Sequence, residues 1–130
     1  MNQSGSEVEN QKNIYKREAA AAQVLAVARK LRDAHPDREL KLLVGGDFNT
    51  NDDDPEYVSE STLRSFYGAH FRSCSRDWKK HQKITHPAAN GFPDATFDYI
   101  LYRGFERIVS RKIYPGSPVS DHNLVALRLK

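Results

Sequence analysis

The sequence predicts a single α/β domain of the α+β type, with one mixed, mostly antiparallel sheet covered by helices on one face. Three observations predict this class. Apolar residues recur at helical spacing in 15–34, and a two-residue alternation runs through 96–102 and 124–129. The chain has 130 residues, of which 38% are hydrophobic and 28% are charged, and these values suit one domain with a modest core.

The first part of the chain predicts a polar terminus followed by a helix. Residues 1–13 are rich in Gly, Ser, Asn and Gln, so we expect a flexible polar terminus or linker there. The segment 15–34 then carries the helical pattern, and His35-Pro36 ends it. The apolar stripe of this predicted helix consists of Val24, Val27, Ala28 and Leu31.

A strand and a second helix are predicted next. The short apolar run 40–44 lies between charged residues and Gly45-Gly46, which predicts a strand buried on both faces. The second helix is predicted to begin at Pro55, with Asp54 as its N-cap, and to end at Gly68. Its apolar side would carry Leu63, Phe66 and Tyr67.

The last third of the chain predicts three strands. In 96–102, Phe97, Tyr99 and Leu101 share one side, and the residues between them share the other. Arg103-Gly104 then predicts a turn into a strand over 105–114. The loop "YPGSPVS" leads into the last strand, 124–129, in which one face is made of Val125, Leu127 and Leu129.

Composition excludes several classes of protein. A formal charge of +3 and a pI near 9.0 are compatible with a phosphate-bearing partner, but they are too small to identify one. The single cysteine, Cys74, excludes an internal disulfide and a cysteine metal cluster. The sequence has no apolar run of about 18 residues, and residues 1–13 lack the apolar stretch of a secretory signal. The compartment therefore stays open.

A first polar cluster follows the first predicted strand. Asp47 and Asn49 come directly after the apolar run, which is where sheet proteins place ligand-handling side chains. Together with Asn51 they match the first ligand positions of an EF-hand loop. That loop is excluded because its sixth position would hold Asp52 instead of Gly, and its twelfth Val58 instead of Glu. A P-loop is excluded because "GGDFNT" lacks the required lysine.

A second polar cluster lies near the C-terminus. Asp98 is inside a predicted strand with apolar neighbours, and Asp121 and His122 directly precede the last strand. A carboxylate inside such a strand needs a polar partner. Histidine is the natural one, because a carboxylate bound to one ring nitrogen fixes the tautomer and leaves the other nitrogen free for chemistry. We therefore expect Asp98 and His122 to pair.

Three short motifs now carry a family resemblance. In this order, "GGDFN", "FDYIL" and "SDHNLVALRL" resemble the second half of the endonuclease/exonuclease/phosphatase superfamily, which is deoxyribonuclease I-like. The resemblance implies that residues 14–130 form the C-terminal half of a four-layer α/β/β/α sandwich. In this superfamily the first half supplies a metal-binding Glu, an Asn and a further catalytic His, and those motifs are not found in this sequence. We therefore expect an incomplete catalytic domain whose N-terminal half is absent.

The resemblance also implies a reaction, the metal-dependent hydrolysis of phosphodiester bonds, with a nuclease favoured. Asp47 would orient or deprotonate the attacking water, and Asn49 would hold that water or a phosphate oxygen. His122, oriented by Asp98, would donate to the phosphoryl group as its charge grows. Asp121 and Asp47 would bind Mg²⁺ or Mn²⁺. The activity of this chain by itself stays open.

The segment between the second helix and Thr96 is basic and contains Trp78. Its candidate substrate-binding residues are Arg72, Arg76, Lys79 and Lys80, and they suit a nucleic-acid backbone. An alternative is a non-catalytic half-domain that binds a polyanion or a protein through this loop, and another is a phospholipid or sugar-phosphate phosphodiesterase or phosphatase. The expected partners are a phosphate ester, with nucleic acid as one candidate, and either the missing half or a second copy. We interpret His70, His81 and His86 as surface or loop residues.

Overall fold

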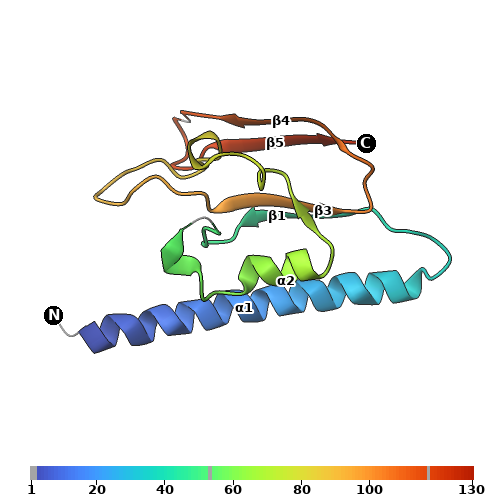
Figure 1. Ribbon diagram of the computed structural model, residues 1–130, viewed down its shortest axis with the longest axis horizontal. Helices are drawn as coiled ribbons and strands as arrows, with labels where there is room; N and C mark the ends of the chain where they lie inside the picture. The colour runs from blue at the N-terminus through green and yellow to red at the C-terminus, as the bar shows by residue number, and fades with distance from the viewer. Residues whose placement is uncertain (1–2, 53, 117) are drawn as a thin grey trace.

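The computed structural model describes residues 3–52, 54–116 and 118–130. Its elements in chain order are α1 (Gln3–Ala34), β1 (Leu42–Asp47), the 3-10 helix η1 (Pro55–Tyr57), α2 (Thr62–Gly68), β2 (Arg72–Ser73), the 3-10 helix η2 (Lys80–Gln82), β3 (Asp98–Arg103), β4 (Ile108–Tyr114) and β5 (Leu124–Leu129). They form three layers: α1 with α2, then a three-stranded sheet, then the hairpin β4–β5 (Figure 1). Helices and antiparallel strands together confirm the predicted fold class.

Helix α1 is longer than predicted. It ends at Ala34, as predicted, but it begins at Gln3 instead of Tyr15. The segment 3–13 is therefore helical and is not the loose terminus we expected, while residues 1 and 2 lie outside the described part of the chain. Four of the eleven residues in this segment are Glu or Gln, which favour a helix, and no proline interrupts it. The domain boundary near residue 13 stays a prediction.

The buried face of α1 is narrower than the predicted stripe. Ala21 is buried, and Leu25 and Ala28 pack against the core at i+4 and i+7 from it. Of the predicted stripe only Ala28 faces the core, because the three larger residues are exposed: Val24, Val27 and Leu31. Within the described residues, no helix combines the length and the apolar character needed to cross a membrane.

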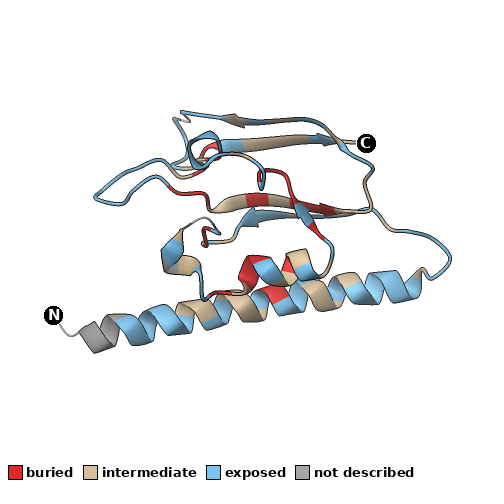
Figure 2. Ribbon diagram, viewed as in Figure 1, coloured by how far each residue is buried: buried red, intermediate tan, exposed pale blue. Residues whose placement is uncertain are grey.

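The main core lies between the three-stranded sheet and the two helices. The strand order is β1-β3-β2, and both pairs are antiparallel. Tyr99 and Leu101 of the central strand β3 are fully buried, and Figure 2 shows buried residues gathered where β3 faces α2. Phe48 meets Phe66 and Tyr99 edge to face, with ring centroids 5.8 and 5.6 Å apart. This face of the sheet is therefore structural.

Strand β1 differs from the prediction in its bounds and in its burial. It covers Leu42–Asp47 instead of 40–44. Leu42 and Val44 pack against the core, whereas Leu43 between them is 57% exposed. The expectation of a strand buried on both faces is therefore wrong, because β1 is an edge strand that is covered by the helices on one face only.

Helix α2 starts later than predicted because the chain first makes the separate turn η1. The N-cap position of α2 is Ser61 instead of Asp54. The Ser61 hydroxyl donates to Glu18 Oε2 at 2.6 Å, and the neighbouring Glu60, only 5% exposed, accepts from Arg17 Nε at 2.7 Å. These two contacts with α1 turn the chain just before α2 and separate the two helical segments.

The C-terminal strands form a separate sheet. In the part of the chain that the structure describes, strands β4 and β5 pair with each other and with no other strand, so the single predicted sheet is in fact two. Strand β5 has its predicted bounds, whereas β4 begins at Ile108 instead of Phe105. The hairpin lies on the side of β3 away from the helices (Figure 1), and Arg111 of β4 donates to Cys74 O at 2.8 Å. The face of β3 that carries Asp98 is therefore turned toward the hairpin.

Gly104 makes the connection between the two sheets possible, which leads to a testable prediction. Its φ is 83°, and a Cβ built at this position would overlap the backbone carbonyl of Leu40. We expect Gly104→Ala to lower the free energy of unfolding by about 2–4 kcal/mol, from a left-handed-backbone cost of about 1 and a steric cost of about 1–3 kcal/mol. Urea denaturation measures this change.

Gly91 provides the matched control, because its φ is 82° but no atom lies within 4 Å of a Cβ built there. Gly91→Ala should cost only about 1 kcal/mol. Equal losses in the two variants would contradict the steric role of Gly104.

Candidate active site

Two aspartates face each other at one end of the three-stranded sheet. Asp47, the last residue of β1, lies directly opposite Asp98, the first residue of β3. Directly opposite residues put their side chains on the same face, where two like charges repel each other. Strand β1 ends here because Asn49 adopts a left-handed backbone with φ of 50°, and its N–H donates to Asp47 Oδ1 at 2.8 Å. The end of the sheet thus presents two carboxylates to a common partner.

That partner is His122, from the segment just before β5. Its Nδ1 lies 2.7 Å from Asp98 Oδ2, and because a carboxylate only accepts, Nδ1 carries the proton of this hydrogen bond. Its Nε2 lies 3.8 Å from Asp47 Oδ2 and 3.9 Å from Asp121 Oδ1. The hydrogen bond to Asp98 is the main cause that raises the pKa of His122, and the charges of Asp98, Asp47 and Asp121 add to it. The predicted pairing of Asp98 with His122 is therefore present.

Two buried polar residues hold this pair in place, and both were missed in the sequence. Thr85 Oγ1 accepts from the backbone N–H groups of Phe97 and Asp98, at 3.0 and 3.1 Å. Asn123, next to His122, donates its backbone N–H to Thr85 O at 2.7 Å and its side-chain amide to Ile84 O at 2.9 Å. These bonds fix the backbone on both sides of the pair. The sequence does not identify either residue as part of the site. What marks them is that they are polar and buried, and their burial is known only from the fold.

His86 also lies in the cluster, although we interpreted it as a surface or loop residue. Its Nε2 is 3.7 Å from Asp121 Oδ2, and its ring meets that of His122 edge to face, with centroids 4.9 Å apart. Its backbone pairs with Ala95 in an isolated β-bridge. The sequence has no spacing signal for this contact, because His86 and His122 are brought together only by the packing of their two loops.

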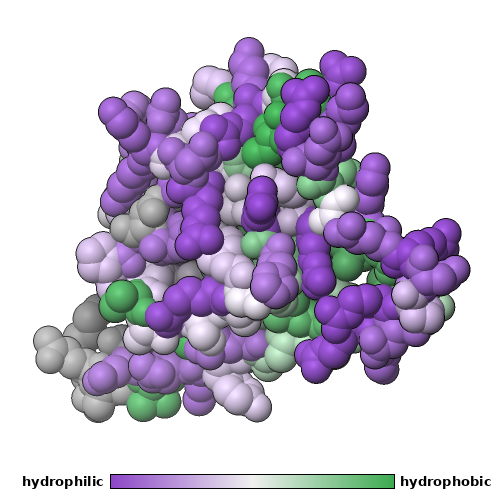
Figure 3. Space-filling model, turned by 45° about the vertical axis from the view of Figure 1, so that its right-hand side comes forward, coloured by the Kyte–Doolittle hydropathy of each residue, from purple (hydrophilic) through white to green (hydrophobic). Residues whose placement is uncertain are grey.

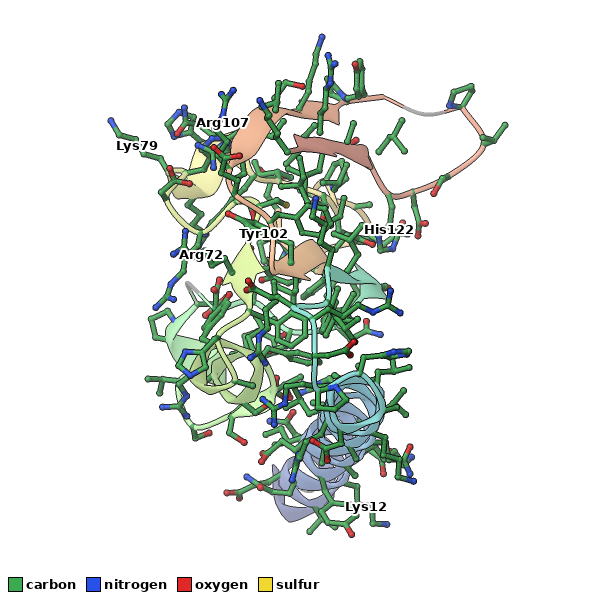
Figure 4. The ribbon with its side chains drawn as sticks, turned by 90° about the vertical axis from the view of Figure 1, so that its right-hand side faces the viewer. Lys12, Arg72, Lys79, Tyr102, Arg107 and His122 are labelled. Carbon is green, nitrogen blue, oxygen red and sulfur yellow. The ribbon has the colours of Figure 1, made fainter. Side chains whose placement is uncertain are left out.

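The predicted basic residues do not join the cluster. Figure 4 shows Arg72 and Lys79 on the opposite side of the molecule from His122. Arg72 pairs with Tyr102, near the end of β3 that lies away from Asp98. The Arg76 guanidinium stacks over the Tyr67 ring at 4.3 Å, and Lys80 begins the exposed turn η2. The structure therefore brings together the predicted catalytic and metal-binding carboxylates and His122, but not the predicted substrate-binding residues.

A basic cavity occupies the other end of the strands. The cavity has a volume of about 710 Å³. Its charged lining consists of Lys41, Arg72, Arg103 and Lys130 with the acidic residues Glu39 and Glu106. Strand β3 spans the distance between this cavity and the aspartates, because it begins at Asp98 and ends at Arg103. The arginines of this cavity and the aspartates near His122 therefore lie at opposite ends of β3.

The cluster suits a divalent cation. Ligand atoms of Asp47, Asp98 and His122 all lie within 4.8 Å of one another. The Asp47 carboxylate and the Asp121 carboxylate, which is 78% exposed, both approach the same side of His122. Carboxylate oxygens are the ligands that Mg²⁺ and Mn²⁺ prefer, so the residues present fit such an ion.

The pKa of His122 gives a test of this geometry. Asp98 raises the pKa of His122 in the folded chain above its value in the unfolded chain. The ion pair therefore stabilises the fold fully at a pH below the unfolded pKa of His122. This stabilisation is lost as the pH rises through the folded pKa. We expect Asp98→Asn to lower the pKa of His122, measured by NMR titration of its ring protons in metal-free buffer. Asp77→Asn is the control, because exposed Asp77 pairs with Arg111 instead. An unchanged His122 titration in Asp98→Asn would contradict the pairing.

A comparison with known protein families agrees with this geometry. The profile of the endonuclease/exonuclease/phosphatase family matches residues 10–122, a range that includes the clustered aspartates and His122. No curated protein and no solved structure matches the chain significantly. Because the family profile spans most of the sequence, this chain belongs to the endonuclease/exonuclease/phosphatase family.

Proposed function

We propose that this chain carries catalytic residues of a metal-dependent phosphodiesterase, with a nuclease favoured. The family acts on phosphate esters, and its members are generally hydrolases that use a divalent metal ion. The observation that supports the proposal most strongly is the 2.7 Å hydrogen bond between Asp98 and His122, which turns His122 Nε2 toward Asp47 and Asp121. A fixed imidazole beside two carboxylates suits hydrolysis of a phosphate ester, which needs a positioned water and neutralisation of developing charge.

Each residue of the cluster has a distinct role in this proposal. Asp98 orients the imidazole and favours its charged form, so that His122 donates from Nε2 to a phosphoryl oxygen as negative charge grows there. Asp47 orients or deprotonates the attacking water, and the exposed Asn49 holds that water or a phosphate oxygen. Asp121 and Asp47 would hold Mg²⁺ or Mn²⁺, which when bound would neutralise charge on the phosphoryl oxygens.

We further propose that another segment completes this site. The two groups of described residues that could hold a metal ion contain no glutamate, whereas the family resemblance implies a metal-binding Glu from an N-terminal half. The hairpin also leaves Leu124 64% and Val109 42% exposed, and Figure 3 shows apolar surface at the top of the molecule, where the hairpin lies. A complementary half, or a second copy of the chain, would cover these side chains.

A second candidate function is the binding of a polyanion without catalysis. The basic cavity lined by Lys41, Arg72 and Arg103 supports it, because lysine and arginine side chains bind phosphate groups regardless of sequence. A phospholipid or sugar-phosphate substrate is the remaining alternative for the acidic cluster. A Mg²⁺ titration separates catalysis from simple polyanion binding, since only the catalytic proposal requires a cation at Asp47 and Asp121.

Substitutions in the cluster test the catalytic proposal. In the complete catalytic domain, Asp47→Asn and His122→Ala should each lower the rate of phosphodiester hydrolysis by about 10² to 10³ or more, the cost of removing a group that acts in the transition state. The measurement is cleavage of double-stranded DNA, and of a small phosphodiester, in the presence of Mg²⁺. Normal hydrolysis by either variant would refute its assigned role.

Matched controls come from the same chain. Asp37→Asn and His81→Ala change the same residue types at exposed positions outside the cluster, so both variants should keep the parent rate. The same assay tests the completing segment, because we expect hydrolysis only when a separately expressed N-terminal half is added. Cleavage by the chain alone would show that the site needs no such segment.

A further inference from the structure

A second group of potential ligands overlaps the proposed catalytic cluster. Ligand atoms of His86, Asp121 and His122 all lie within 4.8 Å of one another. The Asp121 carboxylate joins the two rings, because its Oδ2 is 3.7 Å from His86 Nε2 and its Oδ1 is 3.9 Å from His122 Nε2. We propose that His86, Asp121 and His122 form a binding site for a transition-metal dication of the Zn²⁺ type.

The distances are close to those that such an ion requires. Four ligand atoms placed tetrahedrally around Zn²⁺ at its usual bond lengths are about 3.3 Å from each other. The separations of 3.7 and 3.9 Å are wider than this by roughly half an ångström, and they start from different oxygens of Asp121. The carboxylate would therefore bind through both oxygens or rotate to present one of them to the ion. Asp121 is 78% exposed, so its side chain is free to make this adjustment. Asp47 Oδ2, at 3.8 Å from His122 Nε2, is available as a fourth ligand.

Both histidines are held in positions suited to ligation. Asp98 accepts from His122 Nδ1, which leaves Nε2 with its lone pair in the neutral ring, and a carboxylate behind a ligating histidine is the usual support in metal sites. His86 is fixed by its backbone bridge to Ala95 and by the tilted Phe97 ring, with centroids 5.7 Å apart. Its Nε2 is the ring nitrogen near Asp121. Its Nδ1 is buried without a hydrogen-bond partner among the described residues, so His86 lacks the support that Asp98 gives to His122.

The ligand chemistry separates this ion from Mg²⁺. Two imidazole nitrogens favour Zn²⁺, Ni²⁺ or Cu²⁺, whereas Mg²⁺ prefers oxygen ligands and keeps several waters. The proposed catalytic cation would use Asp47 and Asp121 without His86. A bound Zn²⁺ would also occupy His122 Nε2 and so prevent its donation to a phosphoryl oxygen. This last consequence depends on the proposed function, but Zn²⁺ binding itself does not.

Calorimetric titration of Zn²⁺ into the metal-free chain, in the presence of excess Mg²⁺, tests the site. We expect one Zn²⁺ per chain, and we expect His86→Ala and Asp121→Asn each to weaken binding by at least about tenfold, since even residues that only support a ligand cost that much. His81→Ala and His70→Ala are the histidine controls and should bind as the parent does. Asp121→Asn is a surface change, so it tests the site even where His86→Ala disturbs its loop.

The expected binding also has a spectroscopic signature that does not depend on activity. Co²⁺ in place of Zn²⁺ should give the intense visible absorption of a four-coordinate site in the parent chain, and weaker absorption in the His86→Ala variant. The proposal is overturned if the parent chain binds no Zn²⁺ in excess Mg²⁺, or if His86→Ala and Asp121→Asn bind it as tightly as the parent. Neither result would affect the proposed phosphodiesterase activity.

Discussion

The hydrogen bond between Asp98 and His122 is the interaction on which the rest of the site depends. Strands β1 and β3 end with Asp47 and Asp98 directly opposite each other, and two unscreened carboxylates on one face would repel. His122 lies against both, 2.7 Å from one and 3.8 Å from the other. Because His122 directly precedes β5, this contact also joins the hairpin to the three-stranded sheet. The same hydrogen bond thus orients the imidazole of His122 and helps to hold the β4–β5 hairpin against the three-stranded sheet.

The two faces of β3 carry different kinds of residues: one packs in the core and the other carries Asp98. Tyr99 and Leu101 point into the core against the helices, and Asp98 lies on the other face by the two-residue period of a strand. The hydroxyl oxygen of Tyr99 lies 3.1 and 3.0 Å from the carbonyl oxygens of Thr50 and Thr96, which share its single proton. Thr50 and Thr96 lie close in sequence to Asp47 and Asp98, so the packed core helps to position the strand ends that carry the two aspartates.

Local sequence patterns predicted which helices and strands form, but they predicted less well the residue at which each one begins. The last strand follows from its two-residue periodicity, and the end of α1 follows from His35-Pro36. The pairing of Asp98 with His122 follows because a carboxylate in an apolar strand needs a polar partner. The start of α2 depends on Glu60 and Ser61, which contact α1 across more than forty positions in the chain, and no local pattern encodes that. The helical periodicity also indicated the wrong buried face of α1, because alanine and valine count as nearly equivalent apolar residues in such a pattern.

The site was predicted in its charged centre but not in its surroundings. Motif residues identify Asp47, Asp121 and His122, whereas Thr85, His86 and Asn123 belong to loops that meet only in the folded chain. The distance of Arg72 from the cluster has a similar cause, since β2 pairs with the far end of β3 and no local pattern encodes that pairing. Basic residues in a sequence indicate that a phosphate group could be bound, but only the fold shows at which end of the sheet these residues lie.

Paramagnetic broadening by Mn²⁺ tests most directly whether the end of the sheet around His122 is a metal-binding site. Mn²⁺ broadens NMR signals of nearby nuclei, so titration with this ion locates its binding position without any assumption about the substrate. We expect the signals of Asp47, Asn49, Asp121 and His122 to broaden first, while those of Arg103 and Lys130 at the other end of the strands stay sharp. Broadening that is uniform, or that starts at Arg103, would contradict it.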